Sequence, residues 1–88
     1  MKYHYFTEKE FLSKCPCGYH LSEYVQTLIP PSTSTDLALA REEDENTYTA
    51  EYDVFSSMNE HLGRLTVSCT IQPDRTYSYK LLHKSGSF

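Results

Sequence analysis

From residue 47 onward, apolar and polar residues alternate with a period of two, and this alternation restricts the fold more than any other feature of the sequence. Such a pattern is typical of β-strands that bury one face and expose the other. It recurs in residues 47–54, 64–72 and 77–81, and Pro73-Asp74-Arg75-Thr76 has the residues of a type I turn. The pattern predicts three antiparallel strands.

Residues 36–42 fit two structures. Leu37 and Leu39 alternate with Ala38 and Ala40 as in a strand, whereas alanine, leucine, arginine and glutamate also favour helix. We favour a strand, with Glu43-Asp44-Glu45-Asn46 as the tip of a hairpin that leads into residue 47. This interpretation extends the meander to four strands.

The N-terminal part of the chain carries helix signals. Thr7-Glu8-Lys9-Glu10 fits a capping box, and Phe6 and Phe11 have the spacing of a hydrophobic staple. Because Pro16 lacks an amide donor, this helix is short and a turn follows at residues 15–18.

A second helix is predicted over residues 21–29, where apolar residues recur at helical spacing up to Pro30. The sequence therefore predicts an α+β fold in which two short N-terminal helices pack on one face of a three- to four-stranded antiparallel β-meander. The 88 residues, 39% of them hydrophobic, suit a single small α+β domain spanning residues 1–88.

The size of the chain excludes a large enzyme with a deep enclosed site. No apolar run reaches the roughly 18 residues that a membrane helix needs, so we expect no association with a membrane. The first residues lack the apolar segment of a signal peptide. We therefore expect a cytoplasmic protein, located in the host cytoplasm if a phage encodes it.

The charge is unevenly distributed along the chain, whose formal net charge is -4. Residues 36–60 contain eight acidic residues and one basic residue, whereas residues 61–88 contain four basic residues and one acidic residue. This distribution disfavours direct binding of nucleic acid, which needs clustered lysine and arginine. It favours a basic partner, although the acidic run could equally be a solvated turn that keeps a small protein soluble.

These observations predict a non-enzymatic binding or inhibitor protein that docks an acidic hairpin surface on a basic surface of another protein, such as a nucleic-acid-binding enzyme. Carboxylates spread along a strand and turn can imitate the spacing of phosphates. Exposed tyrosines would add amphipathic anchors. The expected partner-binding residues are Glu42, Glu43, Asp44, Glu45, Glu51, Asp53, Tyr48 and Tyr52.

The order of short helices, antiparallel strands and acidic residues resembles that of the small uracil-DNA glycosylase inhibitors. Small phage proteins of the anti-restriction and anti-CRISPR kinds are similar in size. The resemblance implies an inhibitor that acts as a DNA mimic. It concerns the layout alone, and no functional residue is carried over from it.

A zinc-stabilised adaptor is an alternative function. Cys15, Cys17, His20 and Cys69 are candidate ligands, but Cys-Pro-Cys departs from the Cys-x2-Cys spacing of a zinc knuckle. The simpler interpretation is a turn with a buried thiol, in a protein without a cofactor.

A second alternative is a single-stranded nucleic-acid binder, in which Tyr77 and Tyr79 stack on bases while Lys80 and Lys84 neutralise phosphates. For catalysis the sequence offers no candidate. Its histidines are not spaced to activate a cysteine, and its isolated glycines do not form a phosphate-binding loop.

Overall fold

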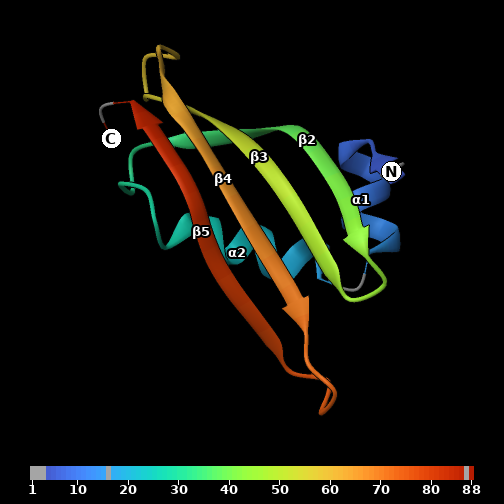
Figure 1. The fold of residues 1–88 in the computed structure, drawn as a ribbon. Helices are drawn as coiled ribbons and strands as arrows, with labels where there is room; N and C mark the ends of the chain where they lie inside the picture. Colours follow the sequence, from blue (N-terminus) through green and yellow to red (C-terminus); the bar gives the residue numbers. More distant parts are fainter. Residues whose placement is uncertain (1–3, 16, 87) are drawn as a thin grey trace.

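A computed structural model of the chain describes residues 4–15, 17–86 and 88. Five antiparallel strands form one sheet in the order β1-β2-β3-β4-β5, and two helices cover one of its faces (Figure 1). In chain order the elements are β1 (His4–Phe6), α1 (Glu8–Lys14), α2 (Gly18–Gln26), β2 (Ser34–Asp44), β3 (Thr47–Phe55), β4 (His61–Ile71) and β5 (Tyr77–Gly86). The predicted α+β class is confirmed. Neither of the two helices in the described part of the chain has the length and apolar character needed to cross a membrane.

The start of α1 is the capping box that the sequence predicts. The Thr7 amide donates to the Glu10 carboxylate at 3.1 Å, and the Glu10 amide donates to the Thr7 hydroxyl at 3.2 Å. The rings of Phe6 and Phe11 lie 6.4 Å apart, as expected of a hydrophobic staple. Local side chains therefore fix both the first turn of α1 and the direction in which the chain enters it.

The second helix is displaced relative to its prediction. It begins at Gly18 and ends at Gln26, before the last apolar residues of the predicted segment. Leu21 and Val25 are fully buried in its interface with the sheet, and Ile29 joins the core from the segment that follows the helix. The apolar stripe is thus a core face, although only part of it is helical.

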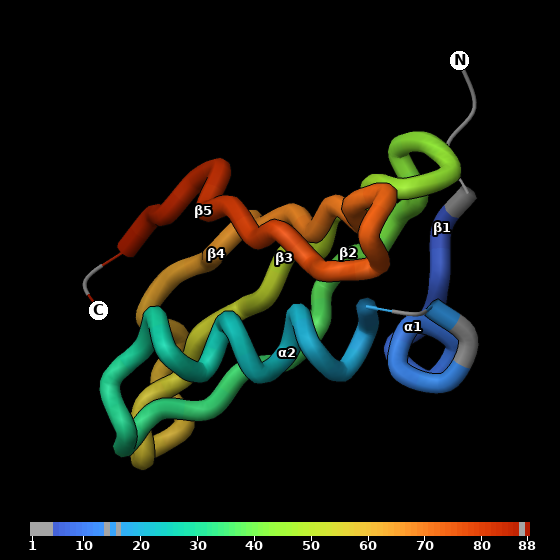
Figure 2. Tube along the Cα trace, turned by 90° about the horizontal axis from the view of Figure 1, so that it is seen from below, coloured from blue at the N-terminus to red at the C-terminus, as the bar shows by residue number. Residues whose placement is uncertain are grey.

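The core lies between the helices and the apolar rows of the strands (Figure 2). Strand β3 contributes Tyr48, Ala50, Tyr52 and Val54, and β4 contributes Leu65, Val67 and Cys69. The register pairs Cys69 with Tyr48 and Leu65 with Tyr52, so these side chains share the helix-covered face. The alternating residues point to the other face, which we call the open face. The predicted alternation is confirmed in both strands.

The number of strands and two boundaries differ from the prediction. The three- to four-stranded sheet is wrong because β1 adds a fifth strand, which pairs with β2 from Phe6 opposite Ala40 to His4 opposite Glu42. Three residues are too few to show an alternation, so this strand left no periodic signal in the sequence. Strand β4 starts at His61, which the sequence places in a loop. The strand preferred over a helix at residues 36–42 is confirmed, and the structure extends it to residues 34–44.

We predict that Gly18→Ala destabilises the protein, although the same change in an exposed helix is usually stabilising. A Cβ atom at this position would meet the main-chain oxygen of Phe11, so α1 and α2 would have to separate. Chemical denaturation should show a loss of about 1–3 kcal/mol, the usual cost of overpacking a core. The control Glu23→Ala lies on the exposed side of α2 and should change stability by less than about 0.5 kcal/mol. A stabilised Gly18→Ala variant would contradict the close approach of the two helices.

Candidate functional site

The acidic run forms the end of the β2–β3 hairpin. We call Glu42, Glu43, Asp44 and Glu45 the acidic end. Asp44 is paired with Thr47, the turn lies at residues 45–46, and Glu43 is the extra residue at a register shift between Glu42 and Asp44. Because of this irregularity, Glu42 and Asp44 pair with the neighbouring residues Tyr48 and Thr47 and therefore point to opposite faces of the sheet, although they are two residues apart.

Hydrogen bonds hold this turn in place. The Asn46 amide donates to the Asp44 carboxylate at 2.9 Å, and the Ile71 amide of β4 donates to the Asn46 carbonyl at 2.7 Å. Arg41 donates to Glu43 at 2.6 Å. In the described part of the chain, Asp44 and Glu45 have no ion-pair partner, and both are exposed. The acidic end therefore presents unneutralised carboxylates on a well-ordered turn.

Glu42 extends the negative charge toward α1. Burial, with a smaller contribution from the Glu42 carboxylate, raises the pKa of Tyr48 to about 12. The pKa of Cys15 is raised to about 11, mainly by burial and then by Glu42 and Glu10. Both carboxylates interact electrostatically with the Cys15 thiol, so Glu10 of α1 lies near the same end of the molecule as Glu42.

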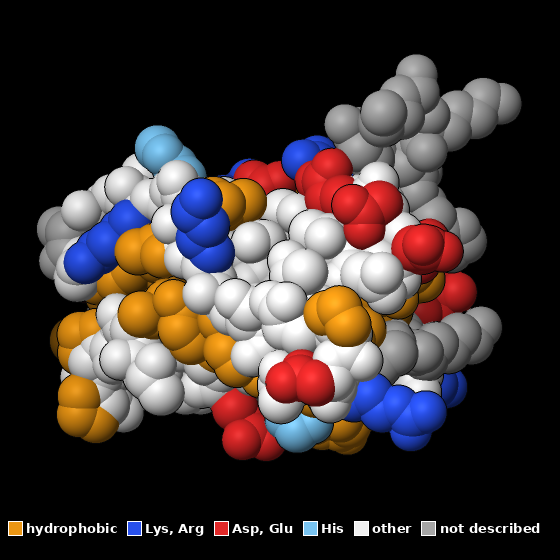
Figure 3. Space-filling model, turned by 60° about the horizontal axis from the view of Figure 1, so that its bottom comes forward, with side chains coloured by type: hydrophobic (Ala, Val, Ile, Leu, Met, Phe, Trp, Pro, Cys, Tyr) orange, Lys and Arg blue, Asp and Glu red, His pale blue; other side chains and the backbone are white. Residues whose placement is uncertain are grey.

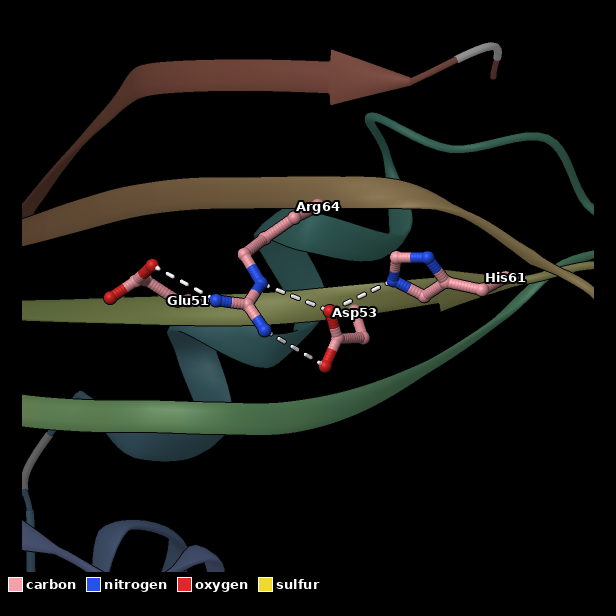
Figure 4. A network of polar contacts seen from close by, with 4 residues as sticks. All are labelled: Glu51, Asp53, His61 and Arg64. Carbon is pink, nitrogen blue, oxygen red and sulfur yellow. Dashed lines mark hydrogen bonds and ion pairs between the residues drawn. The ribbon is translucent and has the colours of Figure 1, made fainter.

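Glu51 and Asp53 do not belong to the acidic end. They lie on the open face of β3, where Arg64 and His61 of β4 contact them (Figure 4). The Asp53 carboxylate accepts from Arg64 Nε at 3.0 Å and Nη2 at 3.3 Å and lies 3.0 Å from His61 Nε2, while Arg64 Nη1 is 3.6 Å from Glu51. The Arg64 guanidinium offsets the charge of both carboxylates, so the eight predicted binding residues do not form one surface.

Arg64 and His61 are not among the binding residues predicted from the sequence, although both belong to this network. The signal available in the sequence is the polar row of β4, which begins at Arg64 and alternates with apolar residues like the row of Glu51 and Asp53. If the polar rows of β3 and β4 are paired as an antiparallel hairpin, Arg64 falls on the same face of the sheet as the acidic residues Glu51 and Asp53.

Tyr48 and Tyr52 are not surface anchors, so this part of the prediction is wrong. Their exposed fractions are 6% and 4%, and both belong to the hydrophobic core. They share a row with Ala50 and Val54, and the helices cover that row. Tyr19, which is 65% exposed, is a surface tyrosine that the sequence analysis did not identify.

The candidate zinc ligands do not converge. Cys15, Cys17 and Cys69 are buried, whereas His20 is exposed and its ring stacks on Tyr77 at 4.8 Å. Burial is the largest cause of the raised pKa of all three thiols. Within the described residues, no three His, Cys, Asp or Glu side chains are placed to hold a metal ion. The geometry thus gives the zinc adaptor no support.

The aromatic and basic residues of β5 point in different directions. The Tyr79 ring stacks on Tyr24 of α2 at 5.0 Å, and Tyr77 is stacked on His20. Lys80 points to the open face with Ser68, and Lys84 lies over the Phe88 ring at 5.0 Å. Because the helix already contacts the tyrosine rings, they do not form a base-stacking platform beside the lysines.

A small hollow of about 70 Å³ lies between the helices and β2 and β3. It is well below the roughly 300–1,000 Å³ of ordinary small-molecule sites. Its lining residues are Glu8, Phe11, Leu12, Ser22, Thr35, Leu37 and Tyr52. This hollow is too small for a typical organic substrate.

In comparisons with known proteins, no family model, curated protein or solved structure matches this chain.

We predict that Asp53→Asn lowers stability at neutral pH and that this effect disappears in acid. Hydrogen bonds from Arg64, helped by His61, lower the pKa of Asp53. A carboxylate with a lowered pKa stabilises the folded state above its unfolded pKa of about 3.9, and this contribution is lost as the pH falls through the folded pKa. Urea midpoints measured at several pH values should therefore converge for wild type and variant once the pH falls below the folded pKa of Asp53.

Asp36→Asn is the matched control, since Asp36 lies directly opposite Asp53 on β2 and is exposed. It removes the same charge without removing the contact with Arg64. A pH profile in which both variants lose stability equally at neutral pH would contradict the specific role of Asp53.

We predict that the three native thiols react slowly with iodoacetamide at mildly alkaline pH. All three are buried, so only a small fraction of each thiol is ionised and accessible to the reagent. Mass spectrometry should show labelling of all three in urea. Ser57→Cys, in the exposed loop before β4, is the positive control and should label quickly in the folded protein. Rapid labelling of native wild type would contradict the observed burial.

Proposed function

We propose that this chain is a non-enzymatic binding protein whose acidic end docks on a basic surface of another protein. The observation that carries this proposal is the pair of exposed carboxylates, Asp44 and Glu45, on a hydrogen-bonded turn. Neither has an ion-pair partner in the described part of the chain.

The order of the turn supports binding at this end. Asn46 is bonded on both sides, to Asp44 and to Ile71, and the hydroxyls of Thr47 and Thr70 lie 3.5 Å apart beside it. Carboxylates on a preorganised turn lose little conformational freedom when a partner binds. The order of this turn favours a binding role for the acidic run over a purely solvating one.

The distribution of charge supports a basic partner. Figure 3 shows a group of acidic side chains at one end of the molecule and apolar side chains with lysine or arginine at the other, while further acidic and basic side chains lie between and beside them. Such an asymmetric field attracts a basic surface to one end of the molecule and orients the approach. Glu51 and Asp53 contribute less, because Arg64 offsets them.

A basic surface that normally binds nucleic acid would suit this end. Glu43 and Asp44 at the end of β2 and Glu45 in the turn place three carboxylates in succession, and carboxylates can replace phosphates as partners of lysine and arginine. In this form of the proposal the protein is an inhibitor that competes with nucleic acid for its target.

Amide variants of the acidic end test the proposal. The variant Glu43→Gln, Asp44→Asn, Glu45→Gln removes three charges but keeps an acceptor for the Asn46 amide. The matched control Glu23→Gln, Asp36→Asn, Glu60→Gln removes three exposed charges elsewhere. Proteins captured from a lysate of the source organism, or of its host, should be retained by wild type and control but not by the acidic-end variant.

The captured protein is then purified and its affinity measured directly. We expect the acidic-end variant to bind at least about tenfold more weakly, and this difference to shrink as salt rises. Equal binding of both variants would refute docking through the acidic end. Competition with a DNA or RNA oligonucleotide tests the inhibitor form separately, since a partner whose binding is unaffected by saturating oligonucleotide contradicts nucleic-acid mimicry.

A further inference from the structure

Strand β5 leaves one edge of the sheet open. Its ten residues pair with β4, and no described strand lies on its other side. Apart from Tyr77 and Tyr79, all its residues are exposed. The edge strand at the other side, β1, has only three residues. A long edge of unpaired amides and carbonyls is a template for one more strand.

Helix α2 provides apolar surface beneath this edge. In Figure 1, α2 passes behind β4 and β5, and its C-terminal end emerges on the outer side of β5. Tyr24 of α2 stacks on Tyr79, and Leu81 points to the same helix-covered face because it pairs with Val67. Leu81 is nevertheless 38% exposed, and Leu82, at a register shift, is 48% exposed.

The charge of this edge is positive on both faces. Lys80 points to the open face and Lys84 to the helix-covered face, with His83 between them in sequence. No acidic residue occurs between Arg75 and Phe88. Pairing two copies of β5 would bring like charges together, which is unfavourable, whereas an acidic strand would be attracted.

We propose that β5 binds an extended acidic segment of a partner protein as a sixth strand of the sheet. Main-chain hydrogen bonds to β5 would supply affinity, and the alternating side chains of the segment would supply specificity. Apolar side chains on one face would contact Leu81 and Tyr24, while acidic side chains on the other would meet Lys80. The acidic end joins β2 and β3, and β4 separates β3 from β5, so this surface is distinct from the acidic end and the inference does not depend on the proposed function.

A peptide titration of the full chain tests this inference. The probe is an eight-residue peptide of alternating valine and glutamate with blocked termini, and the comparison peptide has lysine in place of glutamate. In NMR spectra of the isotope-labelled protein, the acidic probe should shift amide signals of β5 and of Tyr24. Its affinity should exceed that of the lysine peptide by at least about tenfold.

Two N-methylated forms of the acidic probe separate strand pairing from simple charge attraction. One form carries methyl groups on every valine amide and the other on every glutamate amide. Because successive amides of a strand point to opposite edges, one form should lose binding and the other should keep it. Equal binding of both forms would overturn strand addition.

Two single variants locate the site. Lys80→Glu should weaken binding of the acidic probe by about tenfold, because Lys80 faces the acidic side chains of the probe, whereas Lys9→Glu, the same change on the exposed surface of α1, should not. The acidic-end variant should keep full peptide binding, which distinguishes this site from the one proposed above. Shifts outside β5 and α2, no shift at millimolar peptide, or a dimer through β5 without peptide would each refute the inference.

Discussion

The packing of α1 and α2 on one face of the sheet is the contact on which the rest of the structure depends. Each central strand has one apolar row, and without the helices that row would face water. Burial of these rows is the main favourable contribution to folding, because apolar surface leaves water in proportion to its area. Phe11, Leu21 and Val25 lie fully buried in the same cluster as the strand residues Leu65, Val67 and Cys69. The close approach at Gly18 lets both helices take part in this layer.

This one-sided packing limits where the protein can recognise a partner. The covered face is occupied by the core, and the hollow between the helices and strands β2 and β3 is small. The open face carries polar side chains whose charges are partly offset, as in the contacts of Arg64 with Asp53 and Glu51. The surfaces left for recognition are the acidic turn between β2 and β3 and the positively charged edge of β5. Both proposals follow from the two-layer architecture as much as from the residues themselves.

Tyr48 and Tyr52 show why composition alone was a poor guide to the binding surface. A protein rich in tyrosine was expected to expose some of them as anchors, but these two alternate with polar residues and share their row with Ala50 and Val54. Alternation separates the two rows of a strand with good accuracy. Because the helices cover the apolar row, tyrosines in that row are buried, even though tyrosine is a residue type enriched at protein interfaces.

The sequence by itself determined the local features: the capping box at Thr7, the strands from residue 47 onward, the hairpin that displays Asp44 and Glu45, and the apolar row that includes Cys69. These depend on residues near one another in the chain, so periodicity and turn chemistry suffice to predict them. Only the tertiary structure decided that β1 pairs with β2, that Arg64 neutralises Asp53 eleven residues away, and that β5 ends the sheet. Strand neighbours and ion pairs depend on distances of a few ångströms between residues distant in sequence, and no local pattern specifies those distances.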